Sequence, residues 1–301
     1  MTIKEVRLPS VYVVVVIYNQ YVDDSTTLRS LESLARREVH VIVVDNSTRP
    51  YDNELACTER GWTYLCSHCN AGLSKAYNRA LDYLSHENGV VIWMDDDSTL
   101  TNQYFTEVEG IFANDLADIA VPVICAQDGR FYSPNEAGFF KNHQIKSAGQ
   151  QLSQKRFNAI NSCTAVSLRV YEHYRYDERL FLDQVDQKFF DDQRERGMRF
   201  FKMDTIISHN LSVKGEMDAE KVMRRYDLRI SDFHTYCIIQ GYSILAFRLK
   251  VALWGLAEYS KSRDARLLRY FFSRAIHPDA IFFEDGHAAG RSDEAGGESI
   301  R

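Results

Sequence analysis

The sequence has few cysteines and, near its start, no hydrophobic run long enough to cross a membrane. Six cysteines in 301 residues do not suggest a disulfide scaffold. Cys66 and Cys69 form a CxxC motif, which would indicate a zinc or redox site if a second such pair were present. Without one, we interpret them as ordinary cysteines near the end of a strand. The longest early apolar run, Val11–Tyr18, is far shorter than the roughly 20 residues that span a bilayer.

The sequence also lacks an excess of positive charge. Its net charge is −6, which argues against a general nucleic-acid binder, although a local basic face is compatible with it. Hydrophobic residues make up 45% and charged residues 26%, as in ordinary globular proteins. The first ten residues carry Glu5 and lack a cleavage-site pattern, so they do not resemble a secretory signal. We therefore expect a cytoplasmic protein.

Buried strands alternate with amphipathic helices in the first half of the chain. The strands end in polar residues and the helices have apolar residues at helical spacing. This alternation predicts an α/β fold with a mostly parallel sheet flanked by helices, and ligands then bind at the carboxyl ends of the strands. The expected strands are Val11–Asn19, Val39–Ser47, Thr63–Cys66, Gly89–Ser98 and Asp115–Ala126, and the expected helices are Ser25–Arg36 and Leu73–Leu84.

The second half changes character along its length. Residues 156–210 mix strand-like and helical stretches, and residues 219–273 are helical and rich in Tyr, Leu, Phe and Arg. The last residues are polar and rich in glycine, which is typical of a disordered tail. We expect a catalytic domain over residues 1–212, a helical C-terminal extension over 213–284 and a disordered tail over 285–301.

Two carboxylates, Asp95 and Asp97, follow the fourth buried strand in a DxD motif. Such close carboxylates repel each other and are costly to desolvate, and a divalent cation resolves that conflict. Their hard oxygen atoms suit Mg²⁺ or Mn²⁺. The alternative is an acidic turn that leads into a helix at about Thr101. The position at the end of a buried strand favours the metal site, and a bound diphosphate would complete the ligand shell.

Other polar residues at strand ends fit a nucleotide. Asp45 ends the second strand, where its carboxylate can accept the imide N–H of uracil or thymine; an Asx-turn is the alternative. Tyr18 at the end of the first strand can pack against a base or ribose, or belong to the core. Asn70 and Gly72 precede a helix whose N-terminus suits anions. Asn78 lies on that helix and offers a polar contact.

Together these motifs resemble the glycosyltransferase family 2 pattern of the GT-A fold. The resemblance rests on Tyr18-Asn19, on Asp45 to Ser47, on Asn70, Gly72 and Asn78, and on Asp95 and Asp97, which occur in the order and spacing of the family. It implies an inverting transfer of a sugar from a nucleotide-diphosphate donor to a saccharide acceptor. The implied donor contacts are Tyr18, Asn19, Asp45, Asn70, Gly72, Asn78 and Asp96.

The resemblance extends to the stretch from Phe181 to Gly197, which is similar to the bacterial rhamnosyltransferase-like and galactofuranosyltransferase-like branch. It implies that Asp186 is the catalytic base, because an inverting transfer needs a carboxylate to take the proton of the acceptor hydroxyl. Asp183 is the neighbouring candidate for an acceptor contact. The alternative is an acidic helix N-terminus. The chain departs from many relatives at Lys188 and Asp192, where a Glu and an Arg are common, which puts acceptor contacts in doubt.

The same branch places a histidine after a later strand, here His209, where a neutral imidazole can complete the metal shell. The resemblance thus implies Mn²⁺ or Mg²⁺ held by Asp95, Asp97 and His209. It also implies a role in bacterial surface polysaccharide synthesis. A lipid-linked saccharide is one candidate for the acceptor. The donor sugar stays open between UDP- and dTDP-sugars.

A basic and aromatic stretch follows in the C-terminal helices, from Arg248 to Arg274. It combines Lys250, Lys261, Arg263, Arg266 and Arg269 with Leu253, Trp254, Leu267, Phe271 and Phe272. Such a stretch fits a peripheral contact with the inner face of an anionic membrane, a homo-oligomer interface, or helices packed on the catalytic domain. The three hypotheses stay open at this point.

Two other functions compete with the transferase. A sugar-phosphate nucleotidyltransferase or a dinucleotide-binding dehydrogenase needs a glycine-rich loop after the first strand, and the residues from Ile17 to Asp24 contain no glycine. A non-catalytic sugar-nucleotide-binding or assembly module would keep the fold without the reaction. The joint presence of Asp95, Asp97 and Asp186 argues against that module.

Overall fold

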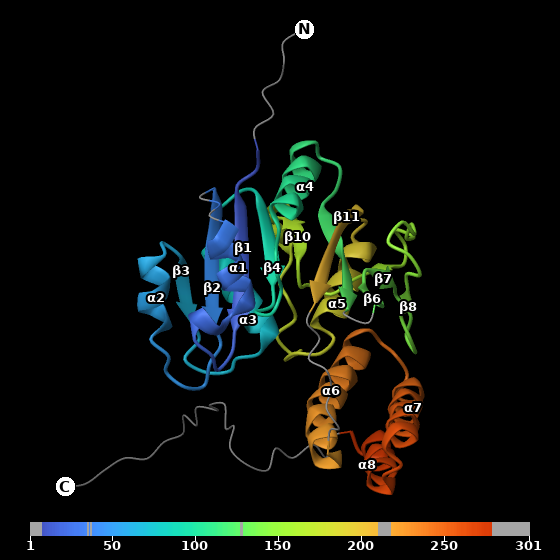
Figure 1. Ribbon diagram of the computed structural model, residues 1–301. Helices are drawn as coiled ribbons and strands as arrows, with labels where there is room; N and C mark the ends of the chain where they lie inside the picture. Colours follow the sequence, from blue (N-terminus) through green and yellow to red (C-terminus); the bar gives the residue numbers. More distant parts are fainter. Residues whose placement is uncertain (1–7, 35, 37, 127–128, 210–217, 279–301) are drawn as a thin grey trace, which may run out of the picture.

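The computed structural model describes residues 8–34, 36, 38–126, 129–209 and 218–278. The predicted tail at 285–301 and the predicted boundary at residue 212 lie outside these ranges. Within them, the predicted alternation of strands and helices is confirmed (Figure 1). No helix of the described part of the chain is both long enough and apolar enough to span a membrane.

The core of the molecule is an eight-stranded sheet in the order β11-β5-β10-β4-β1-β2-β3, with β6 paired to β5. The pairs β1–β2, β1–β4, β2–β3 and β5–β11 are parallel, whereas β10 runs antiparallel to both of its neighbours. The sheet is thus mostly parallel, as predicted. The strands are β1 (Val11–Ile17), β2 (Val39–Asp45), β3 (Thr63–Cys66), β4 (Val90–Met94), β5 (Ile119–Ala126), β6 (Phe131–Ser133), β10 (Thr164–Ser167) and β11 (Phe200–His209).

Helices cover both faces of this sheet because successive strand residues point to opposite sides. In β1, Val13 and Val15 pack into one apolar cluster, together with α1 and α4, and Val14 packs into the other, together with α3 and α5. The β-branched run at the start of the chain is therefore buried on both faces. The helices of this part are α1 (Thr26–Leu34), α2 (Asn53–Glu59), α3 (Leu73–Tyr83), α4 (Asn102–Ala113) and α5 (Val185–Glu195), with 3-10 turns at Val22–Asp24 and Leu168–His173.

A second, small sheet stands beside the main one and has no counterpart among the sequence-based predictions. It pairs β7 (Asn135–Glu136) with β8 (His143–Gln144) and β9 (Phe157–Asn158), all antiparallel. Strands of two residues are too short to leave a periodic pattern in a sequence. Their importance lies in position, because Asn135 and Asn158 face the cavity described below.

Three C-terminal helices lie beyond the carboxyl end of β11 (Figure 1): α6 (Ala219–Ile239), α7 (Ile244–Ser262) and α8 (Ala265–Ile276). They belong to the same apolar cluster as α3 and α5, since Ile230, Phe233 and Phe247 pack in it with Tyr77 and Phe189. The C-terminal helices therefore share a hydrophobic core with the part of the chain that forms the main sheet.

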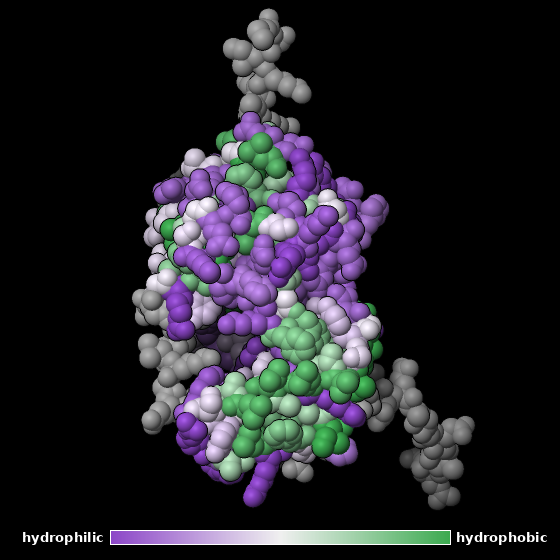
Figure 2. All heavy atoms as spheres, turned by 90° about the vertical axis from the view of Figure 1, so that its right-hand side faces the viewer, coloured by the Kyte–Doolittle hydropathy of each residue, from purple (hydrophilic) through white to green (hydrophobic). Residues whose placement is uncertain are grey.

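The basic and aromatic stretch of the sequence divides between α7 and α8, which meet at Arg263 in the left-handed conformation (φ 57°). Leu267 and Phe271 are buried between the helices. An apolar patch remains exposed on this lobe (Figure 2), and its α7 and α8 members are Ile244, Leu245, Leu249, Leu253, Leu256, Phe272 and Ile276.

Candidate active site

Asp45 ends β2 and is the hub of a hydrogen-bond network. One carboxylate oxygen accepts the backbone N–H of Ser47 at 2.9 Å, which is the Asx-turn. The other accepts Asn53 Nδ2 and the Tyr64 hydroxyl, both at 2.8 Å. Asp45 is 2% exposed and nevertheless borders a cavity of about 920 Å³ at the ends of β2 and β3. Asp45 thus forms the Asx-turn and also borders a cavity that is large enough for a base.

Asn19 fastens the end of β1 to the end of β2. Its backbone lies in the left-handed region (φ 51°), its N–H donates to Ser47 Oγ at 2.8 Å, and its side-chain oxygen accepts the Thr48 N–H at 3.0 Å. Asn19 therefore shapes the turn at the edge of the sheet. Tyr18 beside it is 44% exposed, so its ring is accessible to a ligand and does not belong to the core.

The three acids after β4 form a loop whose backbone carbonyls accept hydrogen bonds from α1. Thr27 Oγ1 donates to the Asp95 carbonyl at 2.6 Å, and the Thr27 N–H donates to the Asp96 carbonyl at 3.1 Å. Gln20, which follows β1, donates to the Asp96 carboxylate. The loop leads to α4, whose first N–H groups Thr101 caps. The helix of the alternative hypothesis exists, but it begins after the acids, so they are not its cap.

The turn before α3 depends on a glycine. Gly72 has a φ of +87°, and a Cβ there would lie 2.9 Å from the carbonyl oxygen of Phe181. The next N–H, of Leu73, donates to that carbonyl at 2.6 Å. Asn70 accepts Asn46 Nδ2 at 3.0 Å, which joins the turn to the end of β2. Gly72 thus lets α3 approach the segment that leads to Asp186.

The structure engages Asn78 in hydrogen bonds within the protein. Its Nδ2 donates to the Tyr176 carbonyl at 2.9 Å and to Glu178 at 3.0 Å, and its Oδ1 accepts the Tyr176 N–H at 2.9 Å. These bonds use both donors of its amide and bury it at 7% exposure. Asn78 therefore anchors α3 to the chain before α5, and we leave it out of the donor site. A polar residue at a helix position gives no local signal of which partner it will meet.

Asp186 is a partly buried residue in the first turn of α5. Its Oδ1 accepts no hydrogen bond from the described residues. Burial first, and the charge of Asp95 second, raise the pKa of Asp186 to about 7, although the Asn161 backbone N–H acts in the opposite direction. The coupling shows that Asp95 and Asp186, which lie far apart in the sequence, come close together in the fold. A carboxyl group with a pKa near neutral suits proton transfer.

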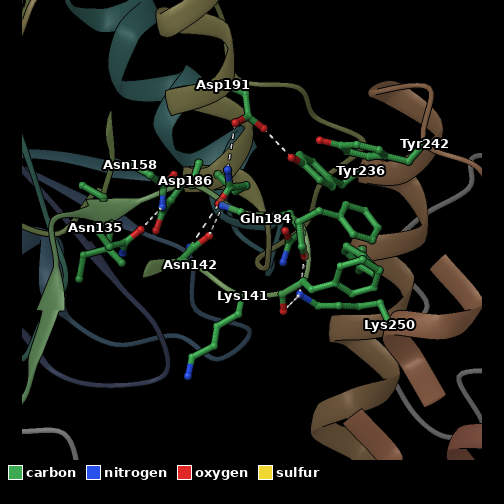
Figure 3. Close-up of a pocket in the computed structure, with 18 of the residues that line it drawn as sticks. Asn135, Lys141, Asn142, Asn158, Gln184, Asp186, Asp191, Tyr236, Tyr242 and Lys250 are labelled. Carbon is green, nitrogen blue, oxygen red and sulfur yellow. Dashed lines mark hydrogen bonds between the residues drawn. The ribbon is translucent and has the colours of Figure 1, made fainter. Parts of the chain in front are cut away.

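A cavity of about 540 Å³ opens beside Asp186 (Figure 3). One wall is the small sheet, where Asn158 Nδ2 donates to Asn135 at 2.9 Å while Asn158 Oδ1 is buried without a partner among the described residues. Asp186 and Asn158 thus border one cavity, and each has a buried acceptor oxygen without a partner among the described residues. Buried acceptors of this kind are costly unless a ligand supplies the donors, and sugar hydroxyls are such donors.

The segment that carries Asp186 into place is held by the C-terminal helix α6. Asp232 accepts the backbone N–H groups of Phe181, Leu182 and Asp183 at 2.7–2.9 Å. Arg225 donates two hydrogen bonds to the Asp183 carboxylate. Asp183 is therefore engaged by the protein in an ion pair, in place of the acceptor contact that the sequence suggested.

Sequence reasoning missed this role of α6, yet a signal exists. Arg225, Arg229, Asp232 and Tyr236 recur at the spacing of one helix face. Ile230 and Phe233 around them are core residues. Polar side chains on a face bordered by core residues indicate that the helix packs against polar partners.

The departures at Lys188 and Asp192 compensate each other. The two side chains form an ion pair one helical turn apart on α5. The chain thus has a cation followed by an anion where many relatives have an anion followed by a cation, and the pairing of opposite charges is kept. Further along α5, Asp191 accepts hydrogen bonds from Gln187, Arg194, Tyr236 and Gln240.

The acids at the end of β4 fit a divalent cation. The charges of Asp95 and Asp97 contribute to raising the pKa of the buried Cys163 thiol, after burial itself, and Asp95 raises that of Asp186. Negative potential is therefore concentrated at this loop, where carboxylate oxygens are the ligands that Mg²⁺ and Mn²⁺ prefer. Within the described side chains, no three His, Cys, Asp or Glu groups form a complete metal-ligand set. The backbone of His209 ends β11, and its side chain lies outside the described part.

The order of the strands arranges these features in a row. Asp45 ends β2, the acids follow β4, and β1 lies between the two strands. Two interstrand spacings, roughly 10 Å, separate the end of β2 from the end of β4. Asp186 lies close enough to Asp95 for their charges to couple, and it borders the second cavity. The carboxyl ends of the strands thus bring Asp45 with its cavity and the acids after β4 to one side of the sheet.

The sequence of the chain is similar to sequences of known proteins. The family model described as "Glycosyl transferase family 2" matches residues 12–175. A dTDP-rhamnosyl transferase, RfbF, from Shigella flexneri is 32% identical over 187 residues, which cover 60% of this chain and 62% of that protein.

Solved structures resemble the fold at low sequence identity. The structure of GalNAc-T7 with UDP, GalNAc and Mn²⁺ is 14% identical, with a TM-score of 0.52, and the match covers 74% of this chain and 48% of that one. Residues 1–349 of TarS from S. aureus are 13% identical with a TM-score of 0.49, over 89% of this chain and 92% of that one. The GT-A type of fold that the sequence predicted is confirmed.

Proposed function

Because the chain belongs to glycosyl transferase family 2, we propose that it is an inverting, metal-dependent enzyme that moves a sugar from a nucleotide-diphosphate donor to a saccharide acceptor. The observation that carries the proposal is the buried, unsatisfied Oδ1 of Asp186, which faces a cavity and lies beside the acids of the DxD motif. The aligned relative from Shigella flexneri, of which the match spans 62%, favours a dTDP-sugar such as rhamnose as the donor; UDP-galactofuranose is the second candidate.

In the proposed reaction, Asp186 takes the proton of an acceptor hydroxyl while its oxygen attacks the anomeric carbon of the donor sugar. The bond from that carbon to the diphosphate breaks at the same time, so the configuration inverts. Asn158 Oδ1 orients the acceptor by accepting a second hydroxyl. Asp45 contacts the base, Tyr18 packs against the nucleoside, and Asn19, Asn70 and Gly72 shape the turns around it.

The cation would be held by Asp95 and Asp97, with His209 as the predicted third ligand. When bound, it supplies positive charge against the diphosphate that leaves. Asp96, which Gln20 holds from the end of β1, lines the diphosphate side of the loop. Mn²⁺ accompanies UDP in the GalNAc-T7 structure, which supports Mn²⁺ as the first metal to test.

The test is turnover of dTDP- and UDP-sugars with Mn²⁺ and simple saccharides, followed as release of the nucleoside diphosphate. Asp186→Asn should lower saccharide-dependent release by roughly 10²- to 10⁴-fold and leave the Kd of the nucleoside diphosphate unchanged. Glu195→Gln, an exposed change of the same kind on α5, is the control and should keep full activity. Equal loss of donor binding in Asp186→Asn would count against its role as the base. No turnover by the wild-type protein with any donor would favour a non-catalytic sugar-nucleotide-binding module.

A further inference from the structure

Two cations from the C-terminal helices face the same cavity as Asp186. Arg229 comes from α6 and Lys250 from α7, and both border the space of about 540 Å³. Figure 3 shows Lys250 entering from the helical lobe, on the other side of the pocket from Asn135 and Asn158. Neither cation takes part in the reaction proposed above, so their presence needs a separate reason.

Arg229 is held in place by aromatic rings. Its guanidinium carbon lies 4.7 Å from the ring centre of Trp254 and 5.4 Å from that of Tyr226. Its Nε is buried and has no hydrogen-bond partner among the described residues. Stacking fixes the plane of a guanidinium while leaving its N–H edge for a planar or tetrahedral anion.

Lys250 adds a second positive charge to the lining of the cavity. Its Nζ donates to the carbonyl oxygens of Phe139 at 2.6 Å and Phe140 at 2.7 Å, which uses two of the three ammonium hydrogens. Burial first, and the nearby charge of Arg229 second, lower the pKa of Lys250 to about 8. Two cations that repel each other in a half-buried place are costly unless an anion joins them.

The carboxylates of the cavity do not neutralise this pair. Asp191 borders the cavity, but its oxygens accept hydrogen bonds from Arg194, Gln187, Tyr236 and Gln240. Asp186 is the other acid of the wall, and burial together with Asp95 already disfavours its charge. Lys141 and Arg194 also border the cavity, and Arg194 is paired with Asp191. The end of the cavity formed by α6 and α7 is thus a positive pocket lined by aromatic rings.

We propose that Arg229 and Lys250 bind an anionic group of the acceptor, so that the acceptor is a saccharide that carries a phosphate or a carboxylate. This inference rests on the proposed function, because it takes the cavity beside Asp186 as the acceptor site. The anion is the acceptor's and not the donor's, since the donor diphosphate is assigned to the acids after β4, and those acids do not line this cavity. A hydroxyl at Asp186 and an anion at Arg229 together fix the orientation of the acceptor.

The experiment measures binding of three small sugars by calorimetry, in EDTA and at low salt. The probes are glucose 1-phosphate, glucuronate and the neutral methyl glucoside. The wild-type protein should bind at least one charged probe more tightly than the neutral one, and the preferred charged probe tells phosphate from carboxylate. Arg229→Gln should weaken the charged probe by roughly 10- to 100-fold without changing the neutral one. The control is Arg224→Gln, which removes the same charge from an exposed position of α6 and should bind as the wild type does.

Lys250→Met provides a second variant, which keeps the length and the apolar packing of the side chain if Arg229→Gln fails to fold. The inference is overturned if charged and neutral probes bind alike, or not at all, or if a folded variant at either position binds the charged probe as the wild type does. Donor turnover tells the two proposals apart. Turnover without charge-dependent binding overturns only the anion site. Charge-dependent binding through Arg229 without any donor turnover overturns the transferase and leaves the anion site standing.

Discussion

The two ends of the candidate site are built on opposite principles. At the donor end, Asp45 and Asn19 have their polar groups bonded to the protein itself. At the acceptor end, Asp186 Oδ1, Asn158 Oδ1 and Arg229 Nε are buried without partners among the described residues. A network in which every hydrogen bond is made is rigid and stabilises the fold. Buried groups without hydrogen-bond partners lower the stability until a ligand supplies the partners. The proposed donor end is thus preformed, whereas the proposed acceptor end has unpaired polar atoms that a substrate can bind.

The largest effect on the free energy of unfolding should come from the contact that joins α6 to the segment before α5. Asp232→Asn replaces one acceptor oxygen by an NH₂ group, so it loses either the hydrogen bond from Phe181 or those from Leu182 and Asp183. We expect the free energy of unfolding to fall by roughly 2–4 kcal/mol, measured by urea denaturation. Glu220→Gln, exposed on the same helix, should have little effect. A loss no larger than that of this control would mean that α6 does not hold the segment.

The preformed donor end can be tested by Asp45→Asn. The new NH₂ group would lie either against the donors of Asn53 and Tyr64 or against the Ser47 N–H. At least one hydrogen bond is then replaced by two donors that face each other. We expect a loss of about 1–3 kcal/mol in the free energy of unfolding, together with weaker binding of the nucleoside diphosphate in calorimetry. Unchanged stability would contradict the view that the donor end is a rigid network.

The same substitution at the acceptor end should have the opposite sign. The pKa of Asp186 is raised from 3.8 to about 7, so the charged form is penalised in the folded protein. That penalty is absent below pH 3.8, grows with rising pH and is complete above about pH 7. Asp186→Asn removes it, and we expect a gain of about 1–2 kcal/mol in the free energy of unfolding near pH 8, shrinking towards acid pH. Denaturation in EDTA across this pH range is the measurement, and a loss of stability at alkaline pH would break the contrast with Asp45.

The smallest effect on the free energy of unfolding is expected at a surface ion pair outside the candidate site. This substitution is the reference for the others. Arg169 is half-exposed and pairs with Asp115 and Asp118 on the surface. Arg169→Gln should lower the free energy of unfolding by less than about 1 kcal/mol, and added salt should reduce the difference further. Thermal unfolding at low and high salt measures it. A loss as large as that of Asp45→Asn would show that the internal network is no stronger than surface ion pairs.

The sequence predicted the strands and their ends well because that information is local. A β-branched run followed by a polar turn marks a buried strand and its end, so the places of Asp45, Asn19 and Asp95 at strand ends were predictable, and their roles stay predictions. The contacts of Asn78 with the segment before α5 were not predictable, because a helix position does not reveal whether a polar side chain faces a ligand or a neighbouring segment.

The acceptor end was predicted only at Asp186. Asn158 lies in a strand of two residues, and Arg229 and Lys250 lie on helices more than 40 positions further along the chain. No local pattern connects these residues. His209 remains a prediction, since its side chain lies outside the described part of the structure.

The sequence by itself determined which strands are buried, where they end and therefore that acids collect at one edge of a parallel sheet. Hydrophobic periodicity carries this information residue by residue. Only the tertiary structure decided that α6 and α7 close a cavity over Asp186 and bring two cations into it, because such convergence depends on the packing of helices distant in sequence.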